Sequence, residues 1–161
     1  MYHYEQGKQH TDAARCAKEA SAHFADFSLE EAKKFAEHYL SNAVSAFGTD
    51  SEKTFEPRIF LAGILNQRGK YQEALENLKQ ALAKLEAGQA SGTTEHINAL
   101  ISLGEAYKGL CKYKKAYALF RSAKMLCTAL PETPVQKLIK LYENEFMAYI
   151  DEARGQCRQV F

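Results

Sequence analysis

The residues of this 161-residue chain that could bind a metal or form disulfides are scattered. Its five histidines and four cysteines include no HExxH pair and no CxxC pair, the spacings that place metal ligands side by side on a helix or turn. They are His3, His10, His23, His38 and His96, with Cys16, Cys111, Cys127 and Cys157. We therefore expect free thiols, no metal site and no cofactor.

Motifs for catalysis are also missing from the sequence. It contains no serine nucleophile elbow, no P-loop and no dinucleotide fingerprint. The glycines of LAGILNQRGK, Gly63 and Gly69, precede a predicted helix instead of following a strand, so they cannot cradle a phosphate in the usual way. We expect a protein without enzyme activity. The alternative is an enzyme whose acidic, histidine and cysteine residues converge from several helices.

The overall charge points to no particular partner. The chain has 21 lysines and arginines against 20 acidic residues, which gives it no basic footprint for nucleic acid or anionic membranes. Its longest apolar run, residues 59–65, is too short to span a bilayer. The first ten residues lack the pattern of a secretory signal. We therefore expect a cytoplasmic protein that binds neither nucleic acid nor membrane.

Apolar residues recur every three or four positions along the chain, as Leu75, Leu78, Leu82 and Leu85 show. Strand patterns with a period of two are missing, so the sequence predicts an all-α fold. We expect a single domain over residues 1–161. The predicted helices cover about residues 11–25, 29–47, 53–68, 71–87, 94–109, 112–129 and 134–156.

Two stretches of the chain are nearly the same: GKYQEALENLKQALAKL from Gly69 and CKYKKAYALFRSAKMLC from Cys111, which defines a 42-residue shift. This shift pairs Tyr71 with Tyr113, Ala74 with Ala116, Ala81 with Ala123, Leu61 with Leu103 and Leu78 with Phe120. A second shift of the same length places Ala32 under Ala74 and so adds a weaker first unit. The expected units are about 11–47, 53–87 and 94–129, followed by a helix over about 134–156.

The last unit resembles a tetratricopeptide repeat. That family's pattern, L-G-x2-Y followed by A-x3-F, appears here as Leu103, Gly104, Tyr107, Ala116 and Phe120. The extended 42-residue unit is similar to those of kinesin light chains and related scaffolds. The resemblance implies a right-handed α-solenoid of about three helix pairs with a C-terminal capping helix.

The resemblance also implies that the first helix of each pair lines a concave groove for peptides. Carried over with the 42-residue shift, the lining residues are Ser21, Phe24, Ile59, Gly63, Asn66, Gln67, Ile101, Glu105 and Lys108. Their amide groups suit hydrogen bonds to a peptide backbone, and the isoleucines suit apolar contacts. The alternative is that they are simply solvated. One family variant grips chaperone tails with lysines and asparagines; Ile59, Gly63, Ile101 and Glu105 cannot form that clamp.

The final predicted helix has an apolar stripe that contains Tyr142, Phe146, Tyr149 and Ile150. Packing against the last repeat is the simpler interpretation of this stripe, because a solenoid needs an end cap. The alternative is that part of it stays exposed and docks a partner or a second copy, which would give a homodimer.

Together these patterns predict a non-enzymatic adaptor or scaffold that binds a protein or peptide partner through the groove or the terminal helix. One alternative is a bacterial secretion chaperone, which resembles the chain in length and repeat type but has shorter units. Another is a self-assembling structural protein in which the terminal helix drives dimerisation.

Overall fold

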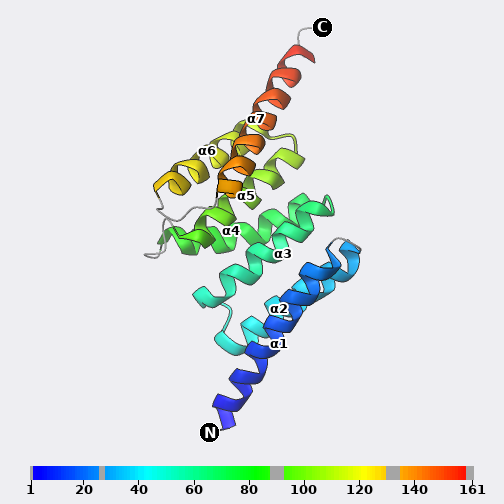
Figure 1. Ribbon diagram of the computed structural model, residues 1–161, viewed down its shortest axis with the longest axis vertical. Coiled ribbons are helices and arrows are strands. Elements are labelled where there is room, and N and C mark those ends of the chain that lie inside the picture. The colour runs from blue at the N-terminus through cyan, green and yellow to red at the C-terminus, as the bar shows by residue number, and fades with distance from the viewer. Residues whose placement is uncertain (1, 26–27, 88–92, 130–134, 159–161) are drawn as a thin grey trace.

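The chain folds almost entirely into helices, as Figure 1 shows for the computed structural model. The structure describes residues 2–25, 28–87, 93–129 and 135–158. Its elements are α1 (Tyr2–Phe24), α2 (Leu29–Phe47), the 3-10 turn η1 (Glu52–Thr54), α3 (Phe55–Gln67), α4 (Tyr71–Ala87), α5 (Thr94–Gly109), α6 (Tyr113–Ala129) and α7 (Val135–Arg158). No strand occurs in the described ranges, and the predicted all-α class is confirmed. The first helix begins at Tyr2, well before the predicted start near residue 11.

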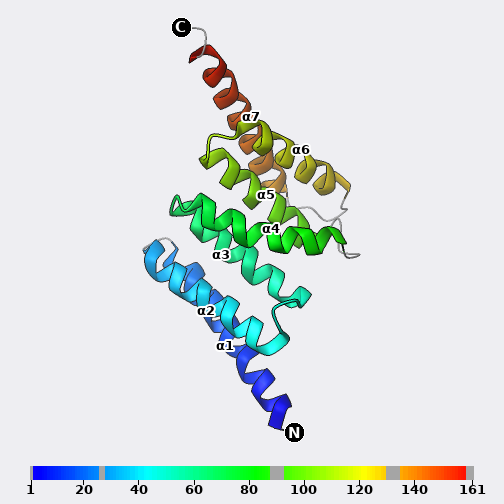
Figure 2. The same cartoon turned by 180° about the vertical axis from the view of Figure 1, so that it is seen from behind.

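The helices stack in pairs to form a right-handed α-solenoid, with the two termini at opposite ends of its longest axis (Figures 1 and 2). Within the pairs, α1 packs on α2, α3 on α4, and α5 on α6. Consecutive pairs are joined because α2 contacts α3, α4 contacts α5, and α6 contacts α7. The first helices also meet directly, α3 with α5 and α5 with α7, so they form one continuous side of the solenoid.

Small residues let the two helices of a pair approach closely. A Cβ added to Gly104 of α5 would lie 2.5 Å from the Phe120 ring of α6, which is closer than van der Waals contact permits. In the preceding pair the same two positions hold Ala62 and Leu78, both fully buried. The pair that has the larger phenylalanine on its second helix therefore has glycine on its first helix, where the preceding pair has alanine.

The turns after α3 and α5 share one conformation. Gly69 in the first turn and Cys111 in the second both have positive φ angles, 72° and 57°. Left-handed backbone disfavours residues other than glycine, so Cys111 adopts it at a cost of about 1–2 kcal/mol. The same hydrogen bond closes both turns across five residues: Lys70 N–H to Leu65 C=O at 2.9 Å, and Lys112 N–H to Tyr107 C=O at 2.8 Å.

The turn after α1 is one residue shorter. Its closing hydrogen bond runs from Ser28 N–H to Phe24 C=O, only four positions apart in the chain, over 2.7 Å. Because of the missing residue, equivalent positions of α1 and α3 are 41 residues apart, whereas those of α2 and α4 are 42 residues apart. Ser21 then corresponds to Ala62 and Gly104, the small residues of the close approach, which accounts for its complete burial.

Candidate functional site

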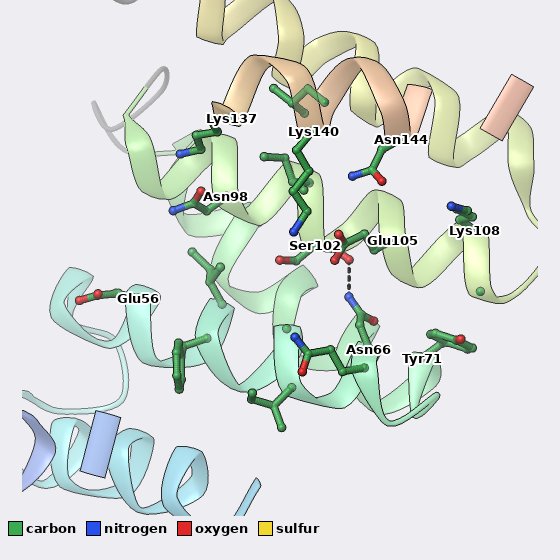
Figure 3. A pocket seen from close by; sticks show the side chains of 18 of the residues that line it. Glu56, Asn66, Tyr71, Asn98, Ser102, Glu105, Lys108, Lys137, Lys140 and Asn144 are labelled. Atoms are coloured by element: carbon green, nitrogen blue, oxygen red, sulfur yellow. Dashed lines mark hydrogen bonds between the residues drawn. The ribbon is translucent and has the colours of Figure 1, made fainter. Parts of the chain in front are cut away.

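A cavity of about 870 Å³ opens on the side of the solenoid formed by the first helices (Figure 3). Most of its lining comes from α3, α5 and α7. Seven of the nine residues predicted for the groove line it: Ile59, Gly63, Asn66 and Gln67 on α3, and Ile101, Glu105 and Lys108 on α5. The structure thus brings these seven residues to one concave surface, which we call the groove cavity.

The other two predicted groove residues, Ser21 and Phe24, lie in the contact between α1 and α2. Ser21 is fully buried, and its hydroxyl donates a hydrogen bond to the Ala32 carbonyl over 2.7 Å. Phe24 stacks on Phe35, with ring centroids 5.5 Å apart and planes 11° from parallel. Neither residue lines the groove cavity, because the shorter first turn rotates both of them into the helix pair.

The first unit contributes Lys18 to the groove cavity instead. With the 41-residue shift, Lys18 is the counterpart of Ile59. Its ammonium group pairs with Glu56, which also accepts a hydrogen bond from the Tyr39 hydroxyl over 3.0 Å. Burial acts to raise the pKa of Glu56, but the hydrogen bonds from Lys18 and Tyr39 outweigh it and hold this pKa below its usual value. The Lys18 and Glu56 charges therefore largely offset each other at this end of the cavity.

Asn66 lies at the wall of the groove cavity where α3 meets α5. Its side chain is only 8% exposed, and its amide nitrogen donates a hydrogen bond to the Ser102 carbonyl over 2.8 Å (Figure 3). Two buried side-chain polar atoms of the described residues have no hydrogen-bond partner: Asn66 Oδ1 and Asn144 Nδ2. Both residues line the same cavity, while the two unpaired atoms themselves are buried. Buried polar atoms of this kind are costly unless another group pairs with them.

Glu105 projects into the cavity near Asn66 (Figure 3). Burial raises the pKa of Glu105 above its usual value, against the opposing influence of Lys140, Lys108 and a hydrogen bond from Asn66. Burial wins because a carboxylate loses hydration in a recess more than the neighbouring cations restore. The charged form of Glu105 is therefore less favourable here than in water.

Helix α7 completes the cavity with polar residues that the 42-residue shift does not reveal. Three lining positions of α5 recur on α7 with a 39-residue shift: Asn98, Ile101 and Glu105 correspond to Lys137, Lys140 and Asn144. In addition, α7 contacts both α6 and α5, as α5 contacts both α4 and α3, although α7 touches α5 over a smaller area than α5 touches α3. We conclude that α7 holds the position of the first helix of a fourth unit. A search that allowed this shorter shift could have found it.

The predicted stripe of α7 lies outside the groove cavity. Tyr142, Phe146 and Tyr149 are 49%, 62% and 62% exposed, and Ile150 is partly buried. The helix packs on the preceding unit through Leu141 and Ala148 instead, which are buried among residues of α5 and α6. The exposed stripe and the packing face are therefore different faces of one helix.

The described residues offer the cavity hydrogen bonds, charge and apolar contact. No group of three or more histidine, cysteine, aspartate or glutamate side chains among them is placed to hold a metal ion. Within the same ranges, no helix has both the length and the apolar character to cross a bilayer.

Comparison with known families now identifies the repeat. Residues 14–87 match the family model described as tetratricopeptide repeat. These residues therefore have the sequence pattern of tetratricopeptide repeats. The resemblance seen in the sequence is confirmed, and beyond the matched residues α5 and α6 continue the same pairing of helices. No curated protein sequence matches the chain.

Solved structures share the tetratricopeptide-repeat fold over most of the chain. A putative kinesin light chain with nearly identical TPR-like repeats from Podosopora anserina is 19% identical, with a TM-score of 0.75 over 88% of this chain and 68% of that one. A TPR-like protein from Chlorobium tepidum is 16% identical, with a TM-score of 0.71 over 92% and 98% of the two chains. BtubC (BKLC) from P. vanneervenii is 18% identical, with a TM-score of 0.67 over 80% of this chain, which spans about half (51%) of that protein.

Proposed function

We propose that this chain is a non-enzymatic adaptor, located in the cytoplasm, that binds an extended segment of a protein partner in the groove cavity. Helical repeat proteins use concave surfaces of this kind for binding, and the cavity volume of about 870 Å³ lies in the range of ligand sites. The observation that carries the proposal is that two residues lining the cavity, Asn66 on α3 and Asn144 on α7, each have an unsatisfied buried amide atom, Oδ1 and Nδ2 respectively.

A peptide main chain supplies what these two atoms lack. Once the two side chains turn toward the cavity, its N–H groups can donate to Asn66 Oδ1, and its carbonyl groups can accept from Asn144 Nδ2. Hydrogen bonds to the main chain give affinity without requiring a particular side chain. Ile59 and Ile101 would add apolar contacts beside them, and Gln67 and Lys108 would act at the end of the cavity near the turns.

The test is a selection of random peptides displayed on phage, followed by titration of the selected peptide against variants of the chain. Asn66→Ala and Asn144→Ala should each weaken binding roughly tenfold, because each leaves one main-chain group of the peptide unpaired. Gln72→Ala is the matched control, since Gln72 is an exposed amide on α4 outside the cavity, and should change affinity less than twofold.

A second measurement asks whether the peptide main chain is what is recognised. Methylation of single backbone nitrogens along the selected peptide should abolish binding at one or two positions and have little effect elsewhere. Selection of no peptide would contradict the proposal. Equal binding by the wild type and both asparagine variants would place the binding surface outside the groove cavity.

A further inference from the structure

The exposed face of α7 has the residues of a helix-packing face. With the 39-residue shift, Leu100 and Tyr107 of α5 correspond to Ile139 and Phe146 of α7. On α5 these residues face α6: Leu100 packs with Ala123 of that helix, and Tyr107 packs against the cluster that contains Phe120. On α7 the counterparts Ile139 and Phe146 are 51% and 62% exposed.

The α7 stripe therefore consists of Ile139, Tyr142, Phe146 and Tyr149, at the alternating spacing of three and four residues by which one helix packs along another, with the partly buried Ile150 at its edge. No helix in the described part of the chain covers it, and the C-terminal half of α7 extends beyond α6 to the end of the molecule (Figures 1 and 2). An exposed apolar face with this spacing fits a helical occupant.

That helix cannot pack as closely as the second helices of the other units do. The close approach of α5 and α6 depends on Gly104, where even a Cβ would meet Phe120 at 2.5 Å. The residue of α7 at this position is Glu143, which is exposed. A helix seated on the stripe must therefore stay at the wider spacing set by tyrosine and phenylalanine side chains, and it must match the charge of Glu143.

One flank of the α7 stripe carries charges that are complementary to those of a second α7 running in the opposite direction. Glu143 and Arg154 are both exposed and lie about three helical turns apart, so they project from the same flank. If two copies of α7 run antiparallel about a two-fold axis near Tyr149, Glu143 of each copy faces Arg154 of the other. A parallel pair would instead bring Glu143 against Glu143 and Arg154 against Arg154.

The other flank carries Glu145 and Glu152, about two helical turns apart, and the antiparallel arrangement brings Glu145 of one copy near Glu152 of the other, where the Lys124 ammonium supplies the opposite charge. Glu145 there is already paired with Lys124 of its own chain over 3.2 Å, and the same ammonium lies 4.3 Å from the centre of the Tyr142 ring. Across the stripe, Phe146 of one copy would pack beside Ala153 of the other, and the two Tyr149 side chains would meet near the axis. The interface is thus isologous, as closed two-fold dimers require.

We propose that a second copy of this chain covers the α7 stripe, with the two α7 helices antiparallel and joined by reciprocal Glu143–Arg154 ion pairs. This inference rests on the face of α7 away from the groove cavity, so its test does not depend on whether the cavity binds a peptide.

The experiment measures the mass of the purified chain by sedimentation equilibrium over a range of concentrations. A monomer–dimer equilibrium is expected. Phe146→Glu should weaken the dimer at least about a hundredfold, since it places two charges in the centre of the interface. Met125→Glu is the matched control: Met125 is 64% exposed on α6, nearly the same as the 62% of Phe146, and its change should have less than a twofold effect.

Charge reversal tests the antiparallel arrangement. Glu143→Arg alone and Arg154→Glu alone should each weaken the dimer roughly tenfold, because each creates two like-charge contacts, and the double variant should restore the wild-type dissociation constant. Circular dichroism of each variant checks that helix content is kept. A monomer at all concentrations overturns the proposal, as does a dimer that Phe146→Glu leaves intact. A dimer that is lost with Phe146→Glu but is insensitive to both single reversals overturns the antiparallel pairing.

Discussion

The Asn66 side chain on α3 donates a hydrogen bond to the Ser102 backbone carbonyl on α5 over 2.8 Å. This bond joins two consecutive units directly, across the first helices and without the second helix α4 between them. The oxygen of the same side chain is buried without a partner, and the residue lines the groove cavity. One asparagine thus connects the stacking of units with the surface proposed to bind a partner.

Replacement of Asn66 should lower stability measurably. Asn66→Ala removes the hydrogen bond to Ser102 and leaves a small void, so we expect a loss of about 1–2 kcal/mol in the free energy of unfolding, measured by urea titration. Gln67→Ala, at an exposed neighbouring position, should change it by less than about 0.5 kcal/mol. A loss as small as that of the control would show that the hydrogen bond contributes nothing to the stacking of α3 on α5.

Gly104→Ala should destabilise the pair α5–α6, since the new Cβ would lie 2.5 Å from the Phe120 ring. Overpacking costs about 1–3 kcal/mol and the gain in helix propensity offsets about 1 kcal/mol, so a net loss of up to about 2 kcal/mol is expected. Gly63→Ala is the control, because nothing lies within 4 Å of its added Cβ; this change should stabilise the chain by up to about 1 kcal/mol.

The same clash should be relieved by a smaller partner. The preceding unit combines Ala62 with Leu78, so Phe120→Leu in the Gly104→Ala background should recover part of the lost stability, although Phe120→Leu alone destabilises. A double-mutant cycle from thermal or urea unfolding measures the coupling. If the losses in unfolding free energy of the two single variants simply add in the double variant, contact between positions 104 and 120 does not cause the destabilisation by Gly104→Ala.

Glu105 should make stability depend on pH. Because burial raises the pKa of Glu105 in the folded chain, its ionisation disfavours the folded state. The cost is absent below the unfolded pKa near 4.3 and grows as the pH rises through the folded pKa. Glu105→Gln should therefore be more stable than the wild type at pH 7 and equally stable below about pH 4. Urea titrations at the two pH values test this, and a stabilisation of equal size at both would contradict it.

Ser21 should tolerate only small replacements, because it holds the close-approach position of α1 and is fully buried. Ser21→Ala loses the hydrogen bond to the Ala32 carbonyl and should cost about 1 kcal/mol or less. Ser21→Leu overpacks the contact between α1 and α2 and should cost about 1–3 kcal/mol. Ala22→Leu, on the exposed side of the same turn, should be nearly neutral. If Ser21→Leu were neutral too, the 41-residue correspondence would be wrong.

The fold could be predicted because its determinants repeat. Alanines such as Ala74 and Ala116 and the tyrosines that open the second helices recur at a fixed distance, and packing forces equivalent residues into equivalent places. The family resemblance implied the groove positions, and the same shift carried them from α3 to α5. Seven of them line the cavity because helix periodicity is regular within these two helices.

The prediction was incomplete wherever the spacing of units changes. A turn shortened by one residue moved Lys18 into the cavity and Ser21 out of it, and the weak first unit offers too few matching residues to reveal such a deletion. Helix α7 follows α5 at a shorter shift than α5 follows α3, so Asn144 had no apparent counterpart. The unsatisfied amide atoms could not be predicted at all, because they depend on what neighbouring units place opposite them.

Most of the lining of the groove cavity comes from helices that are not consecutive in the chain: α4 lies between α3 and α5, and α6 lies between α5 and α7. The distance across the cavity is therefore set by the angles at which successive pairs stack, and no single helix controls it. Small rotations of one helix pair relative to the next would widen or narrow the cavity, and they would also move the two ends of the molecule relative to each other. A peptide bound between α3 and α7 would fix the angles between the helix pairs. A force applied at either end of the molecule would change these angles and therefore the affinity for the peptide.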